Sequence, residues 1–302
     1  MPLQFSVLAS GSQGNSSLVQ VGGTGTLIDF GLGPRAIAKR LESVGSSWER
    51  ISSAFLTHTH GDHLSNDSLM RMAKGRIPLY CHEGHIRGLS HRSGFQALAE
   101  AGLIRHYDER PLLTPTGLRV EPVELRHDGG PTYGFRIEAK LKPRTRSVAL
   151  GYLADTGSWS SQMVDTLTEV DLLGVEFNHD VEMQLRSPRH RSLIARNLGD
   201  RGHLSNEQGA DFIEAVLDRS ARNSVRHVVL LHLSQQCNDP DLALKVARRA
   251  VRGKGSRITV HAARQSSPHP NILLEPSRRR SAVPSQPKAT SLPLFEAFTL
   301  GF

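Results

Sequence analysis

The sequence contains little cysteine and no long hydrophobic run. Cys81 and Cys237 are its two cysteines, they lie far apart, and neither belongs to a CxxC pair. They therefore cannot form a disulfide framework of the kind that small secreted proteins use. No apolar stretch approaches the roughly 20 residues that cross a bilayer, and the first residues lack the basic region of a signal peptide. We expect a cytoplasmic protein without a membrane-spanning segment.

Acidic residues are fewer than basic residues in this sequence. The 302 residues include 37 Lys and Arg against 29 Asp and Glu, which gives a net charge of +8. This balance suits a polyanionic partner such as nucleic acid, although a solvated basic surface explains it equally well. The oligomeric state stays open.

The C-terminal stretch differs in composition from the rest of the chain. Residues 264–302 hold six of the sixteen prolines and five basic against two acidic residues, including Arg278–Arg280. Such a segment lacks a hydrophobic period and resembles a linker. We predict one folded domain over residues 1–263 and a flexible tail over residues 264–302.

Short apolar runs alternate with segments of helical period along the domain. Strands are predicted at Phe5–Leu8, Leu18–Val21, Thr26–Phe30, Ile51–Leu56, Pro78–Cys81, Leu118–Leu125, Tyr133–Ala139, Val148–Ala154, Asp171–Phe177, Val228–His232 and Ile258–His261. Helices are predicted at Pro34–Val44, Asp67–Lys74, His85–Ala101, Arg189–Leu198, Glu207–Ser220 and Asp241–Val251. Strands come first, with few helices, and then mix with helices. This order favours an α/β fold of two sheets with outer helices over a doubly wound parallel sheet.

The segment FLTHTHGDHLSN, residues 55–66, crowds three histidines and an aspartate into six positions. On an extended backbone His58 and His60 point to one side, and Asp62 and His63 follow across Gly61, which permits a tight turn. Imidazole nitrogen and carboxylate oxygen suit Zn²⁺, Mn²⁺ or iron. No cysteine is near, so a cysteine-type structural zinc site is excluded. The pattern predicts a metal site.

The HxHxDH cluster resembles the metal-binding motif of the metallo-β-lactamase superfamily, and this resemblance implies three further ligands in chain order. The sequence offers a candidate for each at the end of a predicted strand, namely His127, Asp155 and His232. Taken singly, the two histidines are equally explained as partly buried structural residues, and Asp155 as a helix cap. Together with the HxHxDH cluster they favour a shared metal centre.

The segment THTHGDH resembles the signature of the metallo-β-lactamase superfamily. The resemblance implies an αββα sandwich, with two mixed sheets flanked by helices and a dinuclear site along one edge. It also implies the ligand sets: His58, His60 and His127 for one ion, Asp62, His63 and His232 for the other, and Asp155 as a bridge. A family member of this kind hydrolyses its substrate with a hydroxide that bridges two Zn or Mn ions, and Asp62 would orient that hydroxide or take up its proton.

Within the superfamily the chain is most similar to the compact YycJ (WalJ) group. FSVLASGSQGNSS, LIDFGL, LADTGSW, VEFNHD, RGHLSN and LLHLSQQCNDP carry this resemblance over about residues 3–263. Secreted zinc β-lactamases have a cysteine where this chain has Asp155, and glyoxalase-type thioesterases surround the third histidine with a different turn. The interval from Asp155 to His232 is too short for a β-CASP insertion. The chain departs from the group at Cys237–Asp239 and in its C-terminal extension. The resemblance implies a 5′-to-3′ exonuclease acting on DNA.

His203 precedes Ser205, a good N-cap for the helix predicted at Glu207–Ser220. Its imidazole would then lie beside a helix N-terminus, which is a ready phosphate site. Nucleases of this superfamily commonly place a histidine there that binds no metal, and we assign His203 as a catalytic proton donor or phosphate contact.

Other residues are candidates for substrate binding because they lie in loops that could reach the rim of the site. Asn178 and His179 also fit a helix cap and a structural histidine, and the segment Ala9–Ser17 also fits a plain β-turn. The candidates are Ser10, Ser12, Asn15, Glu176, Asn178, His179 and Ser205.

Three functions remain in view. The first is a metal-dependent phosphodiesterase on nucleic acid. The second is a hydrolase of small esters, lactones or thioesters that uses the same metals. The third is a non-catalytic metalloprotein, against which the full set of seven candidate ligands argues.

Overall fold

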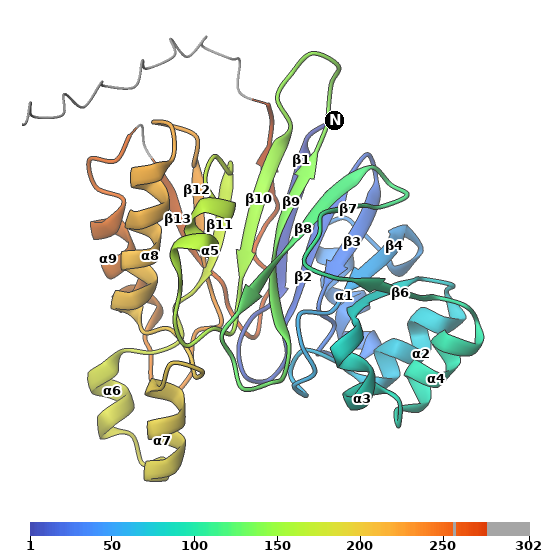
Figure 1. The fold of residues 1–302 in the computed structure, drawn as a ribbon, viewed down its shortest axis with the longest axis horizontal. Helices are drawn as coiled ribbons and strands as arrows, with labels where there is room; N and C mark the ends of the chain where they lie inside the picture. Colours follow the sequence, from blue (N-terminus) through green and yellow to red (C-terminus); the bar gives the residue numbers. More distant parts are fainter. Residues whose placement is uncertain (256–257, 277–302) are drawn as a thin grey trace, which may run out of the picture.

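The computed structural model of the chain describes residues 1–255 and 258–276. Two seven-stranded sheets face each other, and helices cover their outer faces (Figure 1). The prediction of an αββα sandwich with two mixed sheets is confirmed. Residues 278–280, which we singled out in the tail, lie outside the described residues.

The first sheet has the order β14-β1-β2-β3-β4-β5-β6. Its strands β1 to β3 are antiparallel neighbours, whereas β3, β4, β5 and β6 run parallel to one another. The bounds are β1 Leu3–Ala9, β2 Ser16–Val21, β3 Thr24–Ile28, β4 Ile51–Phe55, β5 Leu79–His82, β6 Ile104–Tyr107 and β14 Ile272–Leu274.

The second sheet has the order β13-β12-β11-β10-β9-β8-β7. Strands β10 to β13 are parallel, and β7 to β10 are antiparallel. The bounds are β7 Leu112–Leu113, β8 Leu118–Leu125, β9 Thr132–Ala139, β10 Val148–Leu153, β11 Leu172–Glu176, β12 His227–Leu231 and β13 Thr259–Ala262. All six residues of β10 are buried because this strand is covered on both faces.

Helices cover both outer faces through amphipathic contacts. Buried side chains of α1, α2 and α4 pack on the first sheet, and those of α5, α8 and α9 pack on the second. The bounds are α1 Pro34–Ser43, α2 Asn66–Lys74, α3 Ile86–Leu89, α4 Ser93–Glu100, α5 Ser161–Thr166, α6 Val181–Arg186, α7 Arg191–Leu198, α8 Asn206–Arg219 and α9 Pro240–Ala250, with 3₁₀ turns at Trp48–Arg50 and Glu83–His85. Helices α6 and α7 lie beyond one end of the sandwich (Figure 1).

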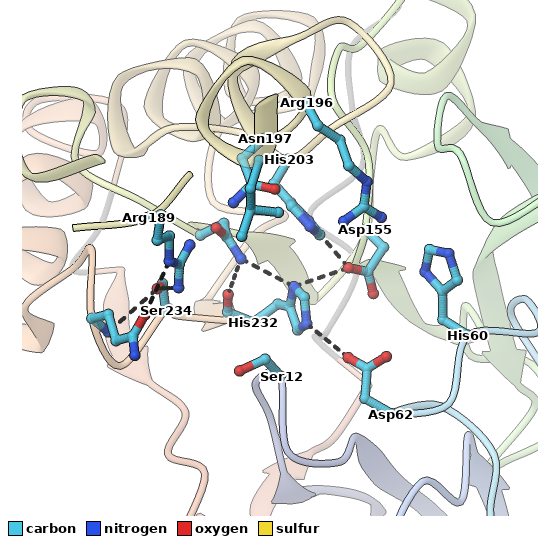
Figure 2. A pocket seen from close by; sticks show the side chains of 13 residues that line it. Ser12, His60, Asp62, Asp155, Arg189, Arg196, Asn197, His203, His232 and Ser234 are labelled. Atoms are coloured by element: carbon cyan, nitrogen blue, oxygen red, sulfur yellow. Dashed lines mark hydrogen bonds and ion pairs between the residues drawn. The ribbon is translucent and has the colours of Figure 1, made fainter. Parts of the chain in front are cut away.

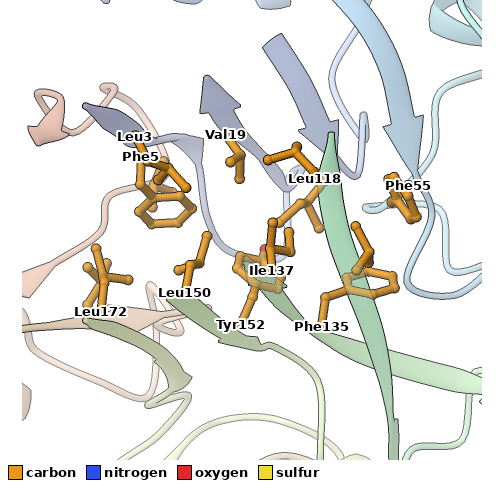
Figure 3. Close-up of a cluster of buried hydrophobic side chains, with 14 of the residues drawn as sticks. Leu3, Phe5, Val19, Phe55, Leu118, Phe135, Ile137, Leu150, Tyr152 and Leu172 are labelled. Carbon is orange, nitrogen blue, oxygen red and sulfur yellow. The ribbon is translucent and has the colours of Figure 1, made fainter. Parts of the chain in front are cut away.

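The main core lies between the two sheets (Figure 3). Phe55 at the end of β4 meets Phe135 of β9 edge to face, with ring centroids 5.5 Å apart. It also stacks on Tyr80 of β5 at 4.5 Å. Edge-to-face and offset pairs of this kind add stability beyond the burial of their area. The aromatic contacts therefore fix the two sheets against each other beside the strand that leads to the histidine cluster.

One predicted helix is interrupted. The segment His85–Ala101 forms α3 and α4 with a turn between them, not one helix. The Asn66 side chain accepts a hydrogen bond from the Gly94 backbone at 2.9 Å. A Cβ at Gly94 would lie 2.5 Å from Leu69 Cβ, so this close approach to α2 fixes where α4 begins. Tertiary contacts thus override the continuous helical period.

The predicted tail begins too early. Residues 264–276 belong to the described fold, and β14 pairs antiparallel with β1. Ile272 and Leu274 are buried in the core between the sheets, and the Gln265 side chain donates to the Gly14 carbonyl at 2.9 Å. A three-residue strand gives too short a pattern to be recognised among prolines. Residues 277–302 lie outside the described residues.

Candidate metal centre

The site lies where the parallel strands of both sheets end. Strands β3 and β4 lead to Asp29 and to the cluster that begins at His58, and β10 and β12 lead directly to Asp155 and His232. Carboxyl ends of parallel strands lie at one edge of a sheet, and ligands of open α/β sheets bind outside these ends. The topology therefore brings together residues that are far apart in sequence.

All seven candidate ligands lie in one cluster. They fall into overlapping groups whose ligand atoms lie within 4.8 Å of one another. Three of these groups are His58, His60 and His127; Asp62, His63 and His232; and His58, His63 and Asp155, and a fourth joins Asp155 and His232 with Glu176 and His203. The first two match the two ligand sets that the family resemblance implies. The third places Asp155 against a member of each set.

The donors fit a divalent cation. His58 Nε2 is buried and, among the described residues, has no hydrogen-bond partner. Asp155 Oδ2 is also buried without a hydrogen bond, although it lies 2.7 Å from His63 Nε2. Buried polar atoms normally find partners, so His58 Nε2 is free to face a ligand that the described residues do not provide, whereas Asp155 Oδ2 has only the His63 imidazole beside it. A donor set of imidazole nitrogen and carboxylate oxygen suits zinc or manganese.

The electrostatics point the same way. Burial alone would lower the pKa of His63, but the Asp155 and Asp29 carboxylates outweigh it and raise this pKa to about 10. The carboxylates thus attract positive charge to the centre of the cluster. Metal binding requires neutral imidazoles and releases such protons, so divalent ions would take the place of protons here.

Asp29 is a functional residue that we did not predict. It is fully buried, and its Oδ2 accepts a hydrogen bond from His63 Nδ1 at 2.7 Å. Its Oδ1 accepts from the Thr57 backbone at 2.8 Å, and both of its oxygens contact the Thr57 hydroxyl. A carboxylate on the far nitrogen of a ligand histidine fixes the ring and its tautomer. The signal in the sequence was an aspartate directly after an apolar strand, in LIDFGL.

Residues of the loop after β1 contact the candidate ligands and hold them in place. Asn15 is buried and donates from Nδ2 to Asp62 Oδ2 at 3.2 Å, and the same nitrogen lies 2.9 Å from His63 Nε2. The Ser10 hydroxyl accepts from the His232 backbone at 2.7 Å. Of the three loop residues that we expected to contact substrate, only Ser12 lines the pocket.

A close backbone approach shapes the other side of the cluster. A Cβ on Gly129 would lie 2.5 Å from His58 Cδ2. The glycine that follows His127 and Asp128 therefore leaves the space that the rings of the first group occupy. His127 itself is oriented by a hydrogen bond from Nδ1 to the Gly202 carbonyl at 2.8 Å.

His203 lies next to the ligands without belonging to the predicted set. Its Nδ1 is 2.8 Å from Glu176 Oε1 and 3.2 Å from Asp155 Oδ1. Burial alone would lower its pKa, but these two carboxylates raise it to about 9. Glu176 also contacts His232 Nδ1 at 3.0 Å and is fully buried. Glu176 thus orients two histidines from behind and does not line the pocket.

The remaining candidates are placed as follows. Asn178 lines the pocket and donates to the His232 carbonyl at 2.9 Å. Ser205 is the N-cap of α8, and its hydroxyl accepts from the Gln208 backbone. His179 is buried, and neither ring nitrogen has a hydrogen-bond partner among the described residues. Burial lowers its pKa to about 4.

Two ligand residues have a strained backbone. Asp155 has a φ of 60° and His232 a φ of 56°. Non-glycine residues rarely adopt this left-handed region, and such strain concentrates at functional sites. Asp155 lies two positions beyond the buried strand β10 and His232 one position beyond β12, so the turns direct their side chains across the strand ends.

A pocket of about 370 Å³ opens over the cluster (Figure 2). Ligand candidates and His203 line one side. The other side is formed by residues that we did not predict, with Arg189 and Arg196 from the α6–α7 segment as its cations. Asp128 accepts two hydrogen bonds from Arg196, one of them from Nη2 at 2.8 Å.

Within the described parts of the chain, no helix is both long enough and apolar enough to cross a membrane.

Comparison with known proteins identifies the family. Residues 25–233 match the family model described as beta-lactamase superfamily domain. The chain is 30% identical over 241 residues to "Exodeoxyribonuclease WalJ" of Streptococcus pneumoniae serotype 2 (strain D39 / NCTC 7466), which covers 80% of this chain and 85% of the relative. It is 29% identical over 256 residues to "Exodeoxyribonuclease YycJ" of Bacillus anthracis, with 84% and 91% covered.

A solved structure shows the same fold. The metallo-β-lactamase fold protein YhfI from Bacillus subtilis superimposes with a TM-score of 0.62 at 16% identity, over 90% of this chain and 100% of that one. The matched family model and the curated relatives extend over most of the chain, including the whole HxHxDH cluster. The chain therefore belongs to the beta-lactamase superfamily, as a metallo-β-lactamase-fold protein of the YycJ/WalJ type.

Proposed function

We propose that this protein is a dinuclear-metal-dependent phosphodiesterase, an exonuclease that acts on DNA. The observation that carries the proposal is the position of His203. It lies outside the seven candidate ligands, yet Glu176 holds it against Asp155 beside the pocket. The printed names of the two exodeoxyribonuclease relatives support a DNA substrate, and 5′-to-3′ polarity is what the group resemblance implies.

The geometry of the cluster supports an assignment of the metal ligands. His58, His60 and His127 would hold one ion, and Asp62, His63 and His232 the other, with Asp155 between them. Zinc and manganese both suit this donor set. When bound, such ions activate a water molecule and offset the charge of the phosphate. His58 Nε2, which has no hydrogen-bond partner among the described residues, would gain one in a bound ion.

His203 would supply the proton that the leaving oxygen needs. An alkoxide is a poor leaving group, so a positioned acid lowers the barrier to its departure. The Glu176 and Asp155 carboxylates raise the pKa of His203, and Glu176, which is not among the seven candidate ligands, favours the protonated imidazole that a proton donor requires. Glu176 acts as a positioning residue, since it contacts His203 and His232 but does not line the pocket.

The size and charge of the pocket are consistent with the end of a DNA strand as substrate. A volume of about 370 Å³ is in the range that holds a single small ligand. Cationic side chains on the α6–α7 side complement a phosphate backbone. We also propose a cytoplasmic location, because Cys81 and Cys237 are both free and buried.

A substrate panel tests the proposal. Purified protein reconstituted with Mn²⁺ or Zn²⁺ is assayed on linear DNA, on linear RNA, and on a lactone and a thioester. We expect nucleotide release from DNA at a rate well above that on the esters. Faster hydrolysis of an ester or lactone, with DNA left intact, would identify a small-molecule hydrolase instead. The Asp155→Ala variant should lose metal from both positions, because Asp155 contacts both ligand groups.

A further inference from the structure

The pocket has two chemically different sides. One side carries the carboxylates and imidazoles of the candidate metal centre, and Arg189 and Ser234 lie on the other (Figure 2). Asn178 and Gln236 also line the pocket. The proposed metal chemistry gives a role to the first side, and no single residue of the second side has yet been given one.

Arg189 is held in place entirely by neutral groups. Its Nε donates to Gln236 Oε1 at 3.0 Å, its Nη1 to Gln184 Oε1 at 3.3 Å, and its Nη2 to Ser234 Oγ at 3.3 Å. Among the described residues no carboxylate lies within ion-pair distance of this guanidinium, whereas Arg196 on the same rim is paired with Asp128. The charge of Arg189 is therefore not offset by a carboxylate within residues 1–255 and 258–276.

The Arg189 guanidinium also has N–H groups that these three hydrogen bonds do not use. An arginine side chain carries five N–H groups in a planar fork. The three bonds above use one N–H on each nitrogen, which leaves one on Nη1 and one on Nη2. Two parallel N–H groups match two oxygens of one phosphate, and a bidentate pair of this kind is stronger and more specific than a single contact.

The arginine is preorganised by buried structure. Gln184, its Nη1 partner, is fully buried in α6, and Asp180 caps that helix by accepting from the Met183 backbone at 2.9 Å. The Ser234 hydroxyl also accepts from the Cys237 backbone at 3.1 Å. A side chain fixed in this way loses little conformational entropy when a ligand binds.

We propose that Arg189 is the receptor for a terminal 5′-phosphate and so restricts the enzyme to 5′-phosphorylated strands. This inference rests on the proposed exonuclease function. The terminal nucleotide lies in the pocket with its scissile phosphodiester at the metal side and its 5′-phosphate on Arg189, and Ser12 and Asn178 line the same pocket. A terminal phosphate carries more charge than an internal diester and offers three oxygens, so the unpaired guanidinium distinguishes an end from the body of a strand.

The test compares strands that differ only at the end. Metal-loaded wild-type protein, Arg189→Gln and Arg186→Gln are assayed on one DNA sequence with a 5′-phosphate, a 5′-hydroxyl or a 3′-phosphate. Arg186→Gln is the matched control, because this arginine lies on α6, pairs with Glu182 and is 78% exposed. Melting temperature and metal content are measured for each protein to establish that it is folded and loaded.

We expect the wild type and the control to prefer the 5′-phosphate at least tenfold in kcat/KM. Arg189→Gln should lose most of this preference, through a rise in KM on the 5′-phosphorylated strand of about 10- to 100-fold, as expected for a charged hydrogen bond. Arg189→Lys should restore part of it. An unchanged preference in Arg189→Gln, an equal loss on both strands, or a wild-type preference for the 3′-phosphate would overturn the inference. If the wild type cleaves 5′-phosphate and 5′-hydroxyl strands equally, the exonuclease stands and the Arg189 assignment fails; if it cleaves no DNA, the proposed function itself fails.

Discussion

Nδ1 of His63 lies 2.7 Å from Oδ2 of Asp29, a carboxylate with no exposed surface that sits beneath the metal-binding cluster. The two residues follow neighbouring parallel strands, β3 and β4, and their contact fixes the ring that stands at the centre of the candidate site. Thr57 holds the same carboxylate through its backbone and its hydroxyl. The site thus has a rigid outer layer that the metal-ligand motif alone does not reveal.

The first prediction concerns this outer layer. Asp29→Asn keeps the shape of the side chain but removes the charge that holds His63, so affinity for Mn²⁺ or Zn²⁺ should fall about 10- to 100-fold. Metal dissociation constants from chelator competition measure the effect. Asp67→Asn, an exposed acid on α2, is the matched control and should bind like the wild type. Equal affinity in both variants would show that Asp29 does not tune the centre.

The second prediction concerns His203. His203→Ala should retain its metal but lose roughly 10²- to 10⁴-fold in turnover on DNA, the range of a lost general acid. The loss should shrink on a p-nitrophenyl phosphodiester, because p-nitrophenolate leaves without a proton. His91→Ala, at an exposed histidine on the surface, is the control.

A pH profile separates a proton donor from a structural histidine. Glu176 and Asp155 raise the pKa of His203 to about 9, so wild-type activity should decline as the pH rises through that value. Glu176→Gln removes one of the carboxylates that raise this pKa, so the decline of activity at high pH (the alkaline limb of the profile) should move to lower pH. Equal losses of His203→Ala on DNA and on the p-nitrophenyl ester, with an unmoved limb in Glu176→Gln, would assign His203 a structural role only.

The seven candidate metal ligands, which lie together in the structure, could be named from the sequence because their signals are local. The HxHxDH spacing is contained in six residues, and His127, Asp155 and His232 each follow an apolar strand. Strands and helices were predicted correctly where the hydrophobic pattern extended over enough residues, as in Leu118–Leu125, which forms β8. Strand ends that meet at one edge then complete the site.

The sequence did not reveal features whose role depends on contacts between distant segments of the chain. Arg189 follows a proline in a basic surface stretch, and only its bonds to Gln184, Ser234 and Gln236 distinguish it from its neighbours. Strand β14 has three residues, and its pairing with β1 spans almost the whole chain. Neither feature has a period or a motif that could be read in the sequence.

A third prediction concerns this last strand. Leu274 is fully buried between the sheets, so Leu274→Ala should lower the free energy of unfolding by about 2–4 kcal/mol. The neighbouring Leu273 is 53% exposed, and Leu273→Ala should change stability by no more than about 0.5 kcal/mol. Urea denaturation of both variants measures the difference. Similar small losses would mean that β14 adds little to the core.

A fourth prediction concerns acid stability. His85 is buried, its Nε2 donates to the Pro131 carbonyl at 2.8 Å, and its Nδ1 accepts from the His82 backbone. Burial lowers its pKa from 6.5 to about 4, because a second proton would be desolvated and would remove the acceptor. Below pH 6.5 the unfolded chain binds the proton and the folded chain does not. Stability is therefore lost as the pH falls from about 6.5 to about 4, by up to ~1.4 kcal/mol per pH unit.

His85→Gln removes this titration. The stability advantage of the wild type over the variant, from urea unfolding, should shrink by about 2 kcal/mol between pH 7.5 and pH 5. A difference that stays constant over this range would show that His85 does not resist protonation in the folded protein.

The most direct measurement of the whole account is nucleotide release from a linear DNA strand and from a closed circle of the same sequence. The protein is stripped of metal and then titrated with Mn²⁺. Because the proposed enzyme binds a strand end in a pocket over a metal centre, the linear strand should be degraded once about two ions per chain have been added, and the circle should stay intact. Degradation without metal, or equal cleavage of circle and linear strand, would contradict the account.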